Sequence, residues 1–422
     1  MRTKIFLITG ALLLTLLTTA QNPWTLQQCV DTALANNRNI KQKVLSKKTS
    51  EIAYQQARLN LLPDLNASAN QSWTFGRSQI QDGTYQNINS SSSSFNISSG
   101  LTLFDGLKMK YDIDARMADL KVSEAELEKI KQDIILNVST IYLQVLLNKE
   151  LLQVSEDQLK LTQLKVEQQK LLVEAGKMAE GEMYELIAQQ SKEESNRIQA
   201  DNNLKLSLLD LAQILELNDF EKLDIVVPAD LMNQELQLLD PQTVYKDALL
   251  HRAEIKSSEY QLSSSEKNVM IAKSAYFPTL DFGVNVGSGY YNSVSTPLST
   301  NLGFSIRIPI FNKFETKNRV KTAQINVESN KLNVENTKLE LRKTVEQAYY
   351  NAIAAKAKWE AANKSEIANK EAYRFANQKY EGGRATVYEL NQAKNNLTQA
   401  ESQVIQAKYE YVFRIKILEL LK

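Results

Sequence analysis

The chain has 422 residues, and its 50 Lys and Arg residues against 49 Asp and Glu residues give a formal net charge of +1, which argues against a nucleic-acid-binding protein. The single cysteine, Cys29, excludes an intrachain disulfide framework. With one histidine, His251, and no glycine-rich phosphate loop or His/Cys cluster, the sequence predicts no enzyme, no cofactor and no metal site.

The N-terminus has the pattern of an export signal. Basic Arg2 and Lys4 precede an apolar run over residues 5–17, and small residues follow at 18–20. A membrane anchor would need about 20 apolar residues, and this run is shorter. Residues 1–20 are therefore predicted to be a signal peptide.

Two parts of the chain repeat one pattern. Leu62-Pro63-Asp64-Leu65 returns 215 residues later as Phe277-Pro278-Thr279-Leu280, and beyond the following strands the spacing settles at 207. A long duplication means one structural unit used twice. We expect a first repeat over 21–216, a linker over 217–240 and a second repeat over 241–422.

Each repeat is expected to open with a helix. Thr25 and Gln28 have the spacing of a capping box, and Asp240 before Pro241 places a cap before a proline at the first helical position. Each helix is expected to run for about 36 residues and to end before the Pro of the repeated motif.

Two segments in each repeat then alternate between apolar and polar residues. The clearest are 280–287 and 302–310, and their counterparts over 65–75 and 95–103 are weaker. Segments of about ten residues with one apolar face are typical of strands in an outer-membrane barrel. A half-buried strand of a β-sandwich would look alike locally.

The strands of each pair are separated by polar runs, Ser90–Ser94 and Ser288–Thr300, which we expect to be loops. Several aromatic residues fall at strand ends or on the apolar side of the alternation. We expect them to form a girdle at the lipid interface. They are Trp73, Phe75, Phe104, Phe277, Phe282 and Phe311.

A helix of exceptional length follows each strand pair, over about 107–173 and 314–380. In the first, apolar residues from Ile113 to Val173 fall at heptad spacing, with one four-residue shift after Ile141. Sustained heptads predict coiled-coil packing, and the shift is a stutter. At 1.5 Å per residue, such a helix is about 100 Å long.

Each long helix is expected to end at a glycine turn, Gly176-Lys177 in the first repeat and Gly382-Gly383-Arg384 in the second. A glycine just past a helix end is typical of a C-cap and suits a helical hairpin. Returning helices are predicted over about 182–216 and 386–420.

Four barrel-type strands per chain cannot form a closed barrel, because the smallest closed ones have eight. Open strand edges do not persist in lipid. The chain must therefore associate, giving eight strands as a dimer or twelve as a trimer. A barrel that continues into long helices is a conduit.

Over essentially all of Trp24–Leu421 the chain resembles the TolC-family outer-membrane efflux proteins (outer membrane factors). The resemblance is carried by the duplicated element order and by short motifs: Leu62-Pro63, Phe277-Pro278, Leu103-Phe104-Asp105-Gly106, Pro309-Ile310-Phe311-Asn312, Gly383-Arg384-Ala385-Thr386 and Leu390-Asn391-Gln392-Ala393. It implies a mainly α fold with a small β part, assembled as a homotrimer with a 12-stranded β-barrel in outer-membrane lipid and an α-helical periplasmic tunnel. It also implies docking to a periplasmic adaptor and an inner-membrane pump.

The family often places aspartates just past the second hairpin turn, and this chain has Tyr388 and Asn391 there. Neighbouring carboxylates either replace those aspartates or are solvated charges of a helix face. The residues predicted for the periplasmic tip, gate and adaptor contact are Gly176, Lys177, Glu182, Glu185, Gly382, Gly383, Arg384, Tyr388, Glu389 and Asn391.

The predicted function is a passive outer-membrane duct for small-molecule efflux. Two alternatives stay open: a protein-secretion duct of a type I system, and an exported coiled-coil scaffold that conducts nothing. A scaffold has no reason to place apolar residues on one face of four strands, so the alternation favours a duct.

Overall fold

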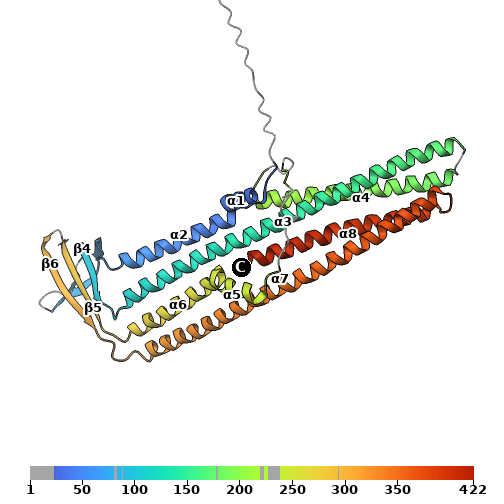
Figure 1. The fold of residues 1–422 in the computed structure, drawn as a ribbon. Coiled ribbons are helices and arrows are strands. Elements are labelled where there is room, and N and C mark those ends of the chain that lie inside the picture. Colours follow the sequence, from blue (N-terminus) through green and yellow to red (C-terminus); the bar gives the residue numbers. More distant parts are fainter. Residues whose placement is uncertain are drawn as a thin grey trace, which may run out of the picture. The chain divides into compact units, whose positions relative to one another are not determined.

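The computed structural model describes residues 23–79, 83–87, 89–176, 179–218, 223–226, 238–292 and 294–422. The predicted signal peptide, Lys177 and most of the predicted linker over 217–240 lie outside these residues. In the described part, both repeats follow the predicted order of helix, strands, long helix and returning helix (Figure 1).

Contacts divide the chain into two bodies, and each body draws on both repeats. The turn body contains the described residues of 1–37, 134–237 and 352–415. The sheet body contains those of 38–133, 238–351 and 416–422. The repeats are therefore units of sequence, and each is shared between two packed bodies.

The first helix of each repeat is broken once, so the prediction of one continuous helix is wrong. The four pieces are α1 (Leu26–Asn36), α2 (Arg38–Leu59), α5 (Pro241–His251) and α6 (Ala253–Ser274). The break falls at Asn37 and at its counterpart Arg252, where ψ is 127° and the backbone leaves the helical region. Arginine is a good helix former, so its own preference does not cause the break. Recurrence at equivalent positions indicates that packing sets it.

Both predicted helix starts are confirmed. The Thr25 hydroxyl accepts a hydrogen bond from the Gln28 amide at 3.2 Å, and the Thr25 amide donates to the Gln28 side chain at 2.9 Å. These two bonds make a capping box. At the second start, the Asp240 carboxylate accepts from the Thr243 amide at 3.1 Å, and Pro241 occupies the first turn.

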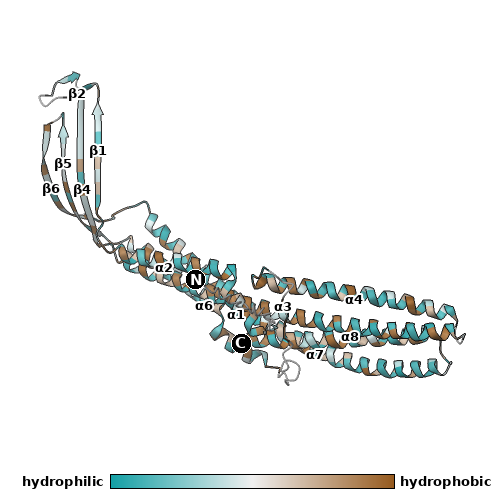
Figure 2. Ribbon diagram, turned by 90° about the horizontal axis from the view of Figure 1, so that it is seen from above, coloured by the Kyte–Doolittle hydropathy of each residue, from teal (hydrophilic) through white to brown (hydrophobic). Residues whose placement is uncertain are grey.

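The long helices and their returning partners begin and end within two residues of the predicted bounds. They are α3 (Lys108–Glu174), α4 (Glu180–Ile214), α7 (Glu315–Glu381) and α8 (Val387–Leu420). Apolar and polar residues are interspersed along all four (Figure 2). None of the described helices is long and apolar enough to cross a membrane.

Four strands form one antiparallel sheet in the order β1 (Asn66–Thr74), β4 (Ser90–Phe104), β5 (Thr279–Tyr291) and β6 (Val294–Arg307). The central β4–β5 pair joins the two repeats. Two short strands, β2 (Arg77–Gln79) and β3 (Tyr85–Asn87), pair separately. β1 and β6 are the edges of the main sheet.

The prediction of polar loops between the strands is wrong. Ser90–Ser94 begins β4, and most of 288–300 lies in β5 and β6. Ser93, for example, lies opposite Gln71 on one side and Tyr290 on the other. Serine-rich composition favours turns, but pairing on both sides satisfies the backbone and overrides that preference.

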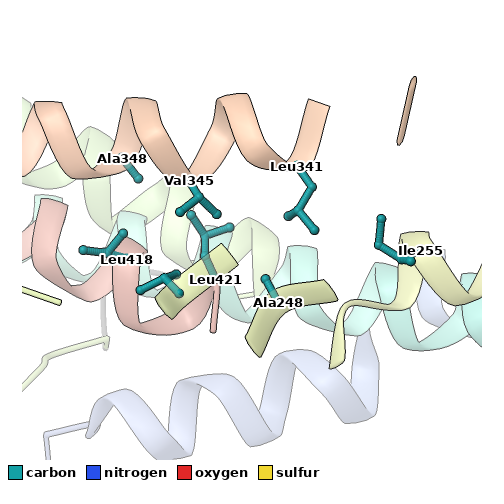
Figure 3. Close-up of a cluster of buried hydrophobic side chains, with 8 residues drawn as sticks. Ala248, Ile255, Leu341, Val345, Ala348, Leu418 and Leu421 are labelled. Atoms are coloured by element: carbon teal, nitrogen blue, oxygen red, sulfur yellow. The ribbon is translucent and has the colours of Figure 1, made fainter. Parts of the chain in front are cut away.

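The sheet body has an apolar core beside the break between α5 and α6. Leu341, Val345 and Ala348 of α7 face Leu418 and Leu421 at the end of α8 (Figure 3). The same cluster contains Val244, Ala248 and Ile255 from the broken helix. Burying side chains of this kind contributes about 1.5–3 kcal/mol each, which fixes the C-terminus of the chain in this body.

In the turn body, α3 holds two extended segments together. Trp24 forms an isolated parallel bridge with Ile225. The fully buried Tyr142 donates its hydroxyl to the backbone carbonyls of Val226 at 2.6 Å and Trp24 at 3.1 Å. Cys29 is buried as a small apolar residue, and burial raises the pKa of its thiol to about 12.

Candidate functional site: the sheet and the hairpin turns

The sheet has one apolar and one polar face. Phe282 and Phe304 lie opposite each other in the register, and their ring centroids are 5.0 Å apart. Because side chains alternate along a strand, the same face carries Val284 and Leu302, which are also paired, and Ile97 of β4. Leu302 is 69% exposed and Phe304 is 71% exposed. Among the described residues, no layer covers this apolar face.

Aromatic residues mark both ends of the apolar face. Trp73 lies at the end where β1 meets the start of β4, and Phe104 lies at the other end beside Leu280. Sequence analysis missed Tyr290 and Phe304, which extend these two rows. From Phe282 to Tyr290 the strand covers about 26 Å. This separation matches the aromatic girdles that flank an apolar band of about 25 Å in outer-membrane barrels.

Three of the other predicted aromatics are exposed. Phe277 precedes β5, and Phe311 follows β6 and packs edge-on against Phe314 at 5.7 Å. Phe75 directly follows β1 and is 75% exposed. Phe282 is half-buried by its neighbour on β6. All six predicted residues therefore lie in or beside the main sheet, and their role at a lipid interface stays a prediction.

The polar face is lined by small and amide side chains. Gly100, Gly283 and Gly303 lie side by side across three strands, with Asn285 opposite Asn301 in the next polar row. A Cβ added at Gly283 or Gly303 would meet no atom within 4 Å. The surface is therefore open at Gly283 and Gly303, whereas at Gly100 an added Cβ would lie 3.3 Å from an Asp64 carboxylate oxygen.

The two hairpin turns use the same C-cap. Gly176 and Gly383 both have φ of +67°, a conformation that favours glycine. At the second turn, the Gly383 amide donates to the Tyr380 carbonyl at 2.9 Å, and the Arg384 amide donates to the Lys379 carbonyl at 2.8 Å. These two bonds are a Schellman motif. The predicted C-cap is confirmed at both glycines.

The two returning helices start differently. Glu389 and Thr386 form a capping box, in which the Thr386 amide donates to the Glu389 carboxylate at 2.9 Å and the Glu389 amide donates to the Thr386 hydroxyl at 3.2 Å. The counterpart of Thr386 in the first repeat is Ala179, which provides no side-chain cap. One oxygen of Glu389 is therefore engaged at the helix start.

The remaining predicted tip residues lie on α4, α8 or the turns. Tyr388 is 68% exposed, Glu185 is exposed and Asn391 is half-buried. Gly382 directly follows α7, and its amide donates to the Gln378 carbonyl at 3.1 Å. Glu182 is half-buried, and one of its oxygens is buried without a hydrogen-bond partner.

Contacts join the two hairpins above their turns. The Lys165 ammonium of α3 donates to the Tyr373 hydroxyl of α7 at 2.9 Å, and the Tyr380 hydroxyl donates to the Gln169 side chain at 3.3 Å. Burial and the charge of Glu182 raise the pKa of Tyr380. Within the described residues, no three His, Cys, Asp or Glu side chains are grouped so as to hold a metal ion.

Comparison with known proteins identifies the family to which these features belong. The family model of outer membrane efflux proteins matches residues 29–216 and 244–415. The toxin and drug export protein A of Aggregatibacter actinomycetemcomitans is 23% identical over 395 residues, which cover 92% of this chain and 83% of that protein. The outer membrane protein TolC of Escherichia coli K12 is 22% identical over 406 residues, covering 92% and 80%.

A solved structure has the same fold. The Campylobacter jejuni CmeC outer membrane channel superimposes with a TM-score of 0.78 at 20% identity, and the match covers 94% of this chain and 85% of that one. At this level of identity the likeness concerns the fold alone.

Proposed function

Because this chain belongs to the outer membrane efflux protein family, the TolC-family outer membrane factors, we propose that it is the passive duct of a tripartite system that exports small molecules. An inner-membrane pump drives the export, and a periplasmic adaptor links the pump to the duct. Membership of this family by itself means that the chain is an outer-membrane efflux channel with a periplasmic extension.

One observation carries the proposal: the main sheet has an uncovered apolar face and two unpaired edges. A closed barrel accounts for both features. Lipid covers the apolar face, and the edge strand of one copy pairs with the opposite edge strand of the next copy. β1 and β6 are the free edges. Three copies would give twelve strands, and the polar face would then line the lumen.

The hairpin turns are the proposed contact for the adaptor. Gly176 and Gly383 hold equivalent turns, and Tyr388 and Asn391 follow the second one. We assign the narrowest point of the duct to these two side chains and to the nearby carboxylates, which are those of Glu182, Glu185 and Glu389. An opening substitution there should raise single-channel conductance, and unchanged conductance would contradict the assignment.

A second candidate is export of proteins through the same duct. It is favoured by the similarity to a relative named a toxin and drug export protein. The uncovered apolar face argues against the scaffold alternative, because a protein that remains in water gains nothing by exposing it.

Loss of a fluorescent dye from preloaded cells tests the proposed substrate class. Host cells that lack the chain should retain ethidium, and cells that produce it should lose the dye in an energy-dependent manner. If both lose it at the same rate while the chain is present in the outer membrane, small-molecule efflux is wrong and protein export replaces it.

A further inference from the structure

The turn body contains a charged cluster that is almost completely buried. Lys394 of α8 is 3% exposed, Glu193 of α4 is 7% exposed and Thr162 of α3 is 1% exposed. The ammonium lies 3.2 Å from one Glu193 oxygen, and the Thr162 hydroxyl donates to the other at 2.6 Å. Lys394 also donates to the Thr162 hydroxyl. We call these three residues the buried triad.

The buried triad connects the α7–α8 hairpin to the α3–α4 hairpin. Gln189 of α4 reinforces this connection, because its amide donates to Glu193 and to Asn395 of α8, at 2.9 Å each. α8 begins seven positions before Lys394, just beyond the second hairpin turn. The triad therefore fixes α8 against α3 and α4 close to its start.

Stability does not account for the charges. Burial lowers the pKa of Lys394, and the neighbouring carboxylate of Glu193 opposes that shift only in part. Removing two charges from water costs about as much as their attraction returns, and well-packed apolar replacements are often as stable or more stable. A buried ion pair therefore calls for another explanation.

The equivalent positions of the duplicated unit do not carry these charges. At the 207-residue spacing, Thr162 corresponds to Asn369, Glu193 to Ala400 and Lys394 to Ile187. Ala400 is buried at 3% exposure, and the Asn369 amide bonds within its own helix at 2.9 Å. The duplicated unit therefore carries this charge pair at only one of its two equivalent places, and at the other Ile187 is 38% exposed.

Duplication creates a problem that such a charge pair solves. Both hairpins carry apolar residues at heptad spacing, so each offers several acceptable registers and each resembles the other as a partner. If α8 packed one heptad out of register, or against another α7–α8 hairpin, Lys394 would be buried without the Glu193 carboxylate beside it. We propose that the buried triad selects the register of α8 and the type of hairpin on which it packs, seating the α7–α8 hairpin on an α3–α4 hairpin.

This proposal holds whether or not the chain conducts, and cross-linking tests it. Gln158 of α3 and Glu401 of α8 touch beside the triad, with nitrogen and oxygen 3.3 Å apart. Cysteines at these positions, in the full chain with Cys29→Ala, report the native register through a short bismaleimide. A second reporter, Q158C with K408C, detects a shift by one heptad.

The decisive variant is K394I with E193A, which replaces the two charged residues by those at their counterpart positions, Ile187 and Ala400. We expect its 158–401 cross-link to fall at least about threefold while 158–408 or interchain links appear. The control, K358I with E410A, removes an exposed α7–α8 ion pair of 2.8 Å and should leave both yields unchanged. An unchanged 158–401 yield in the folded apolar variant would overturn the proposal.

The reversed pair, K394E with E193K, keeps the test valid if the apolar variant fails to fold. Because it retains opposite charges at the same positions, the proposal expects the wild-type 158–401 yield. A folded reversed variant with a yield reduced at least threefold would show that charge pairing does not set the register.

Discussion

Replacing Leu302 with lysine places a charge on the apolar face of the sheet, whereas the same change at the adjacent Asn301 places it on the polar face. Leu302 pairs with Val284, and Asn301 pairs with Asn285, so the two positions lie at the same height. A lysine on the lipid face of a barrel costs about 2–4 kcal/mol at the membrane midplane and about 0–1 kcal/mol near the interfaces, and a lumen-facing change mainly alters selectivity. Leu302 lies two residues from Phe304, at one end of the apolar face, so L302K should cost about 1–2 kcal/mol per chain, or about 3–6 kcal/mol in a trimer.

The assay is the fraction of the chain recovered from outer membranes as a trimer after graded urea treatment. L302K should lose most of its trimer at a urea concentration that leaves wild type and N301K intact. In planar bilayers, N301K should conduct with a shifted ion preference. If L302K and N301K lose trimer to the same extent, the assignment of the two faces is wrong.

Three other predictions concern the turn body. Gly383→Ala should destabilise the α7–α8 hairpin by about 1–2 kcal/mol, because its φ of +67° disfavours a side chain. Gly382→Ala is the control and should change the stability little. Proteolysis at the turn, followed at increasing urea concentration, measures both effects. Tyr142→Phe should speed amide exchange around residues 223–226 by about five- to tenfold, since it removes a hydrogen bond of about 1–1.5 kcal/mol. Tyr349→Phe changes the counterpart residue of the second repeat. An equal rise in exchange around residues 223–226 in that variant would contradict this reasoning. Because the pKa of Cys29 is raised, the folded state keeps a thiol proton that the unfolded state releases above pH 9. The thiol therefore contributes its full stabilisation below pH 9, and this contribution declines up to about pH 12. Cys29→Ala should reduce that decline in denaturation measured over a series of pH values.

The sequence predicts the helical elements well because their signals are local and strong. Heptad spacing and glycine C-caps placed all four long and returning helices within two residues. The break at Asn37 and Arg252 was missed, because neither residue is a helix breaker and the cause lies in packing. The polar starts of β4 and the ends of β5 were missed for a similar reason, since serine and glycine become strand residues only when neighbours pair with them.

The candidate site was predictable in its positions but less so in its partners. The turn glycines have the expected conformation, and the aromatics lie in or beside the sheet. The role of Glu389 in a capping box depends on Thr386, a spacing that sequence analysis could have recognised. The sequence does not predict the buried triad, because its three residues are far apart in the chain and only the packing of the hairpins brings Lys394 to Glu193.

Planar-bilayer conductance of the mature protein, with its oligomeric mass taken from the same sample, tests the central claim of a closed trimeric channel most directly. The account predicts a trimeric mass and discrete conductance steps; should trimers be silent, opening substitutions at Tyr388 and Asn391 must produce the steps. A monomer or dimer that stays in water and never inserts would contradict the barrel, and the scaffold alternative would replace it.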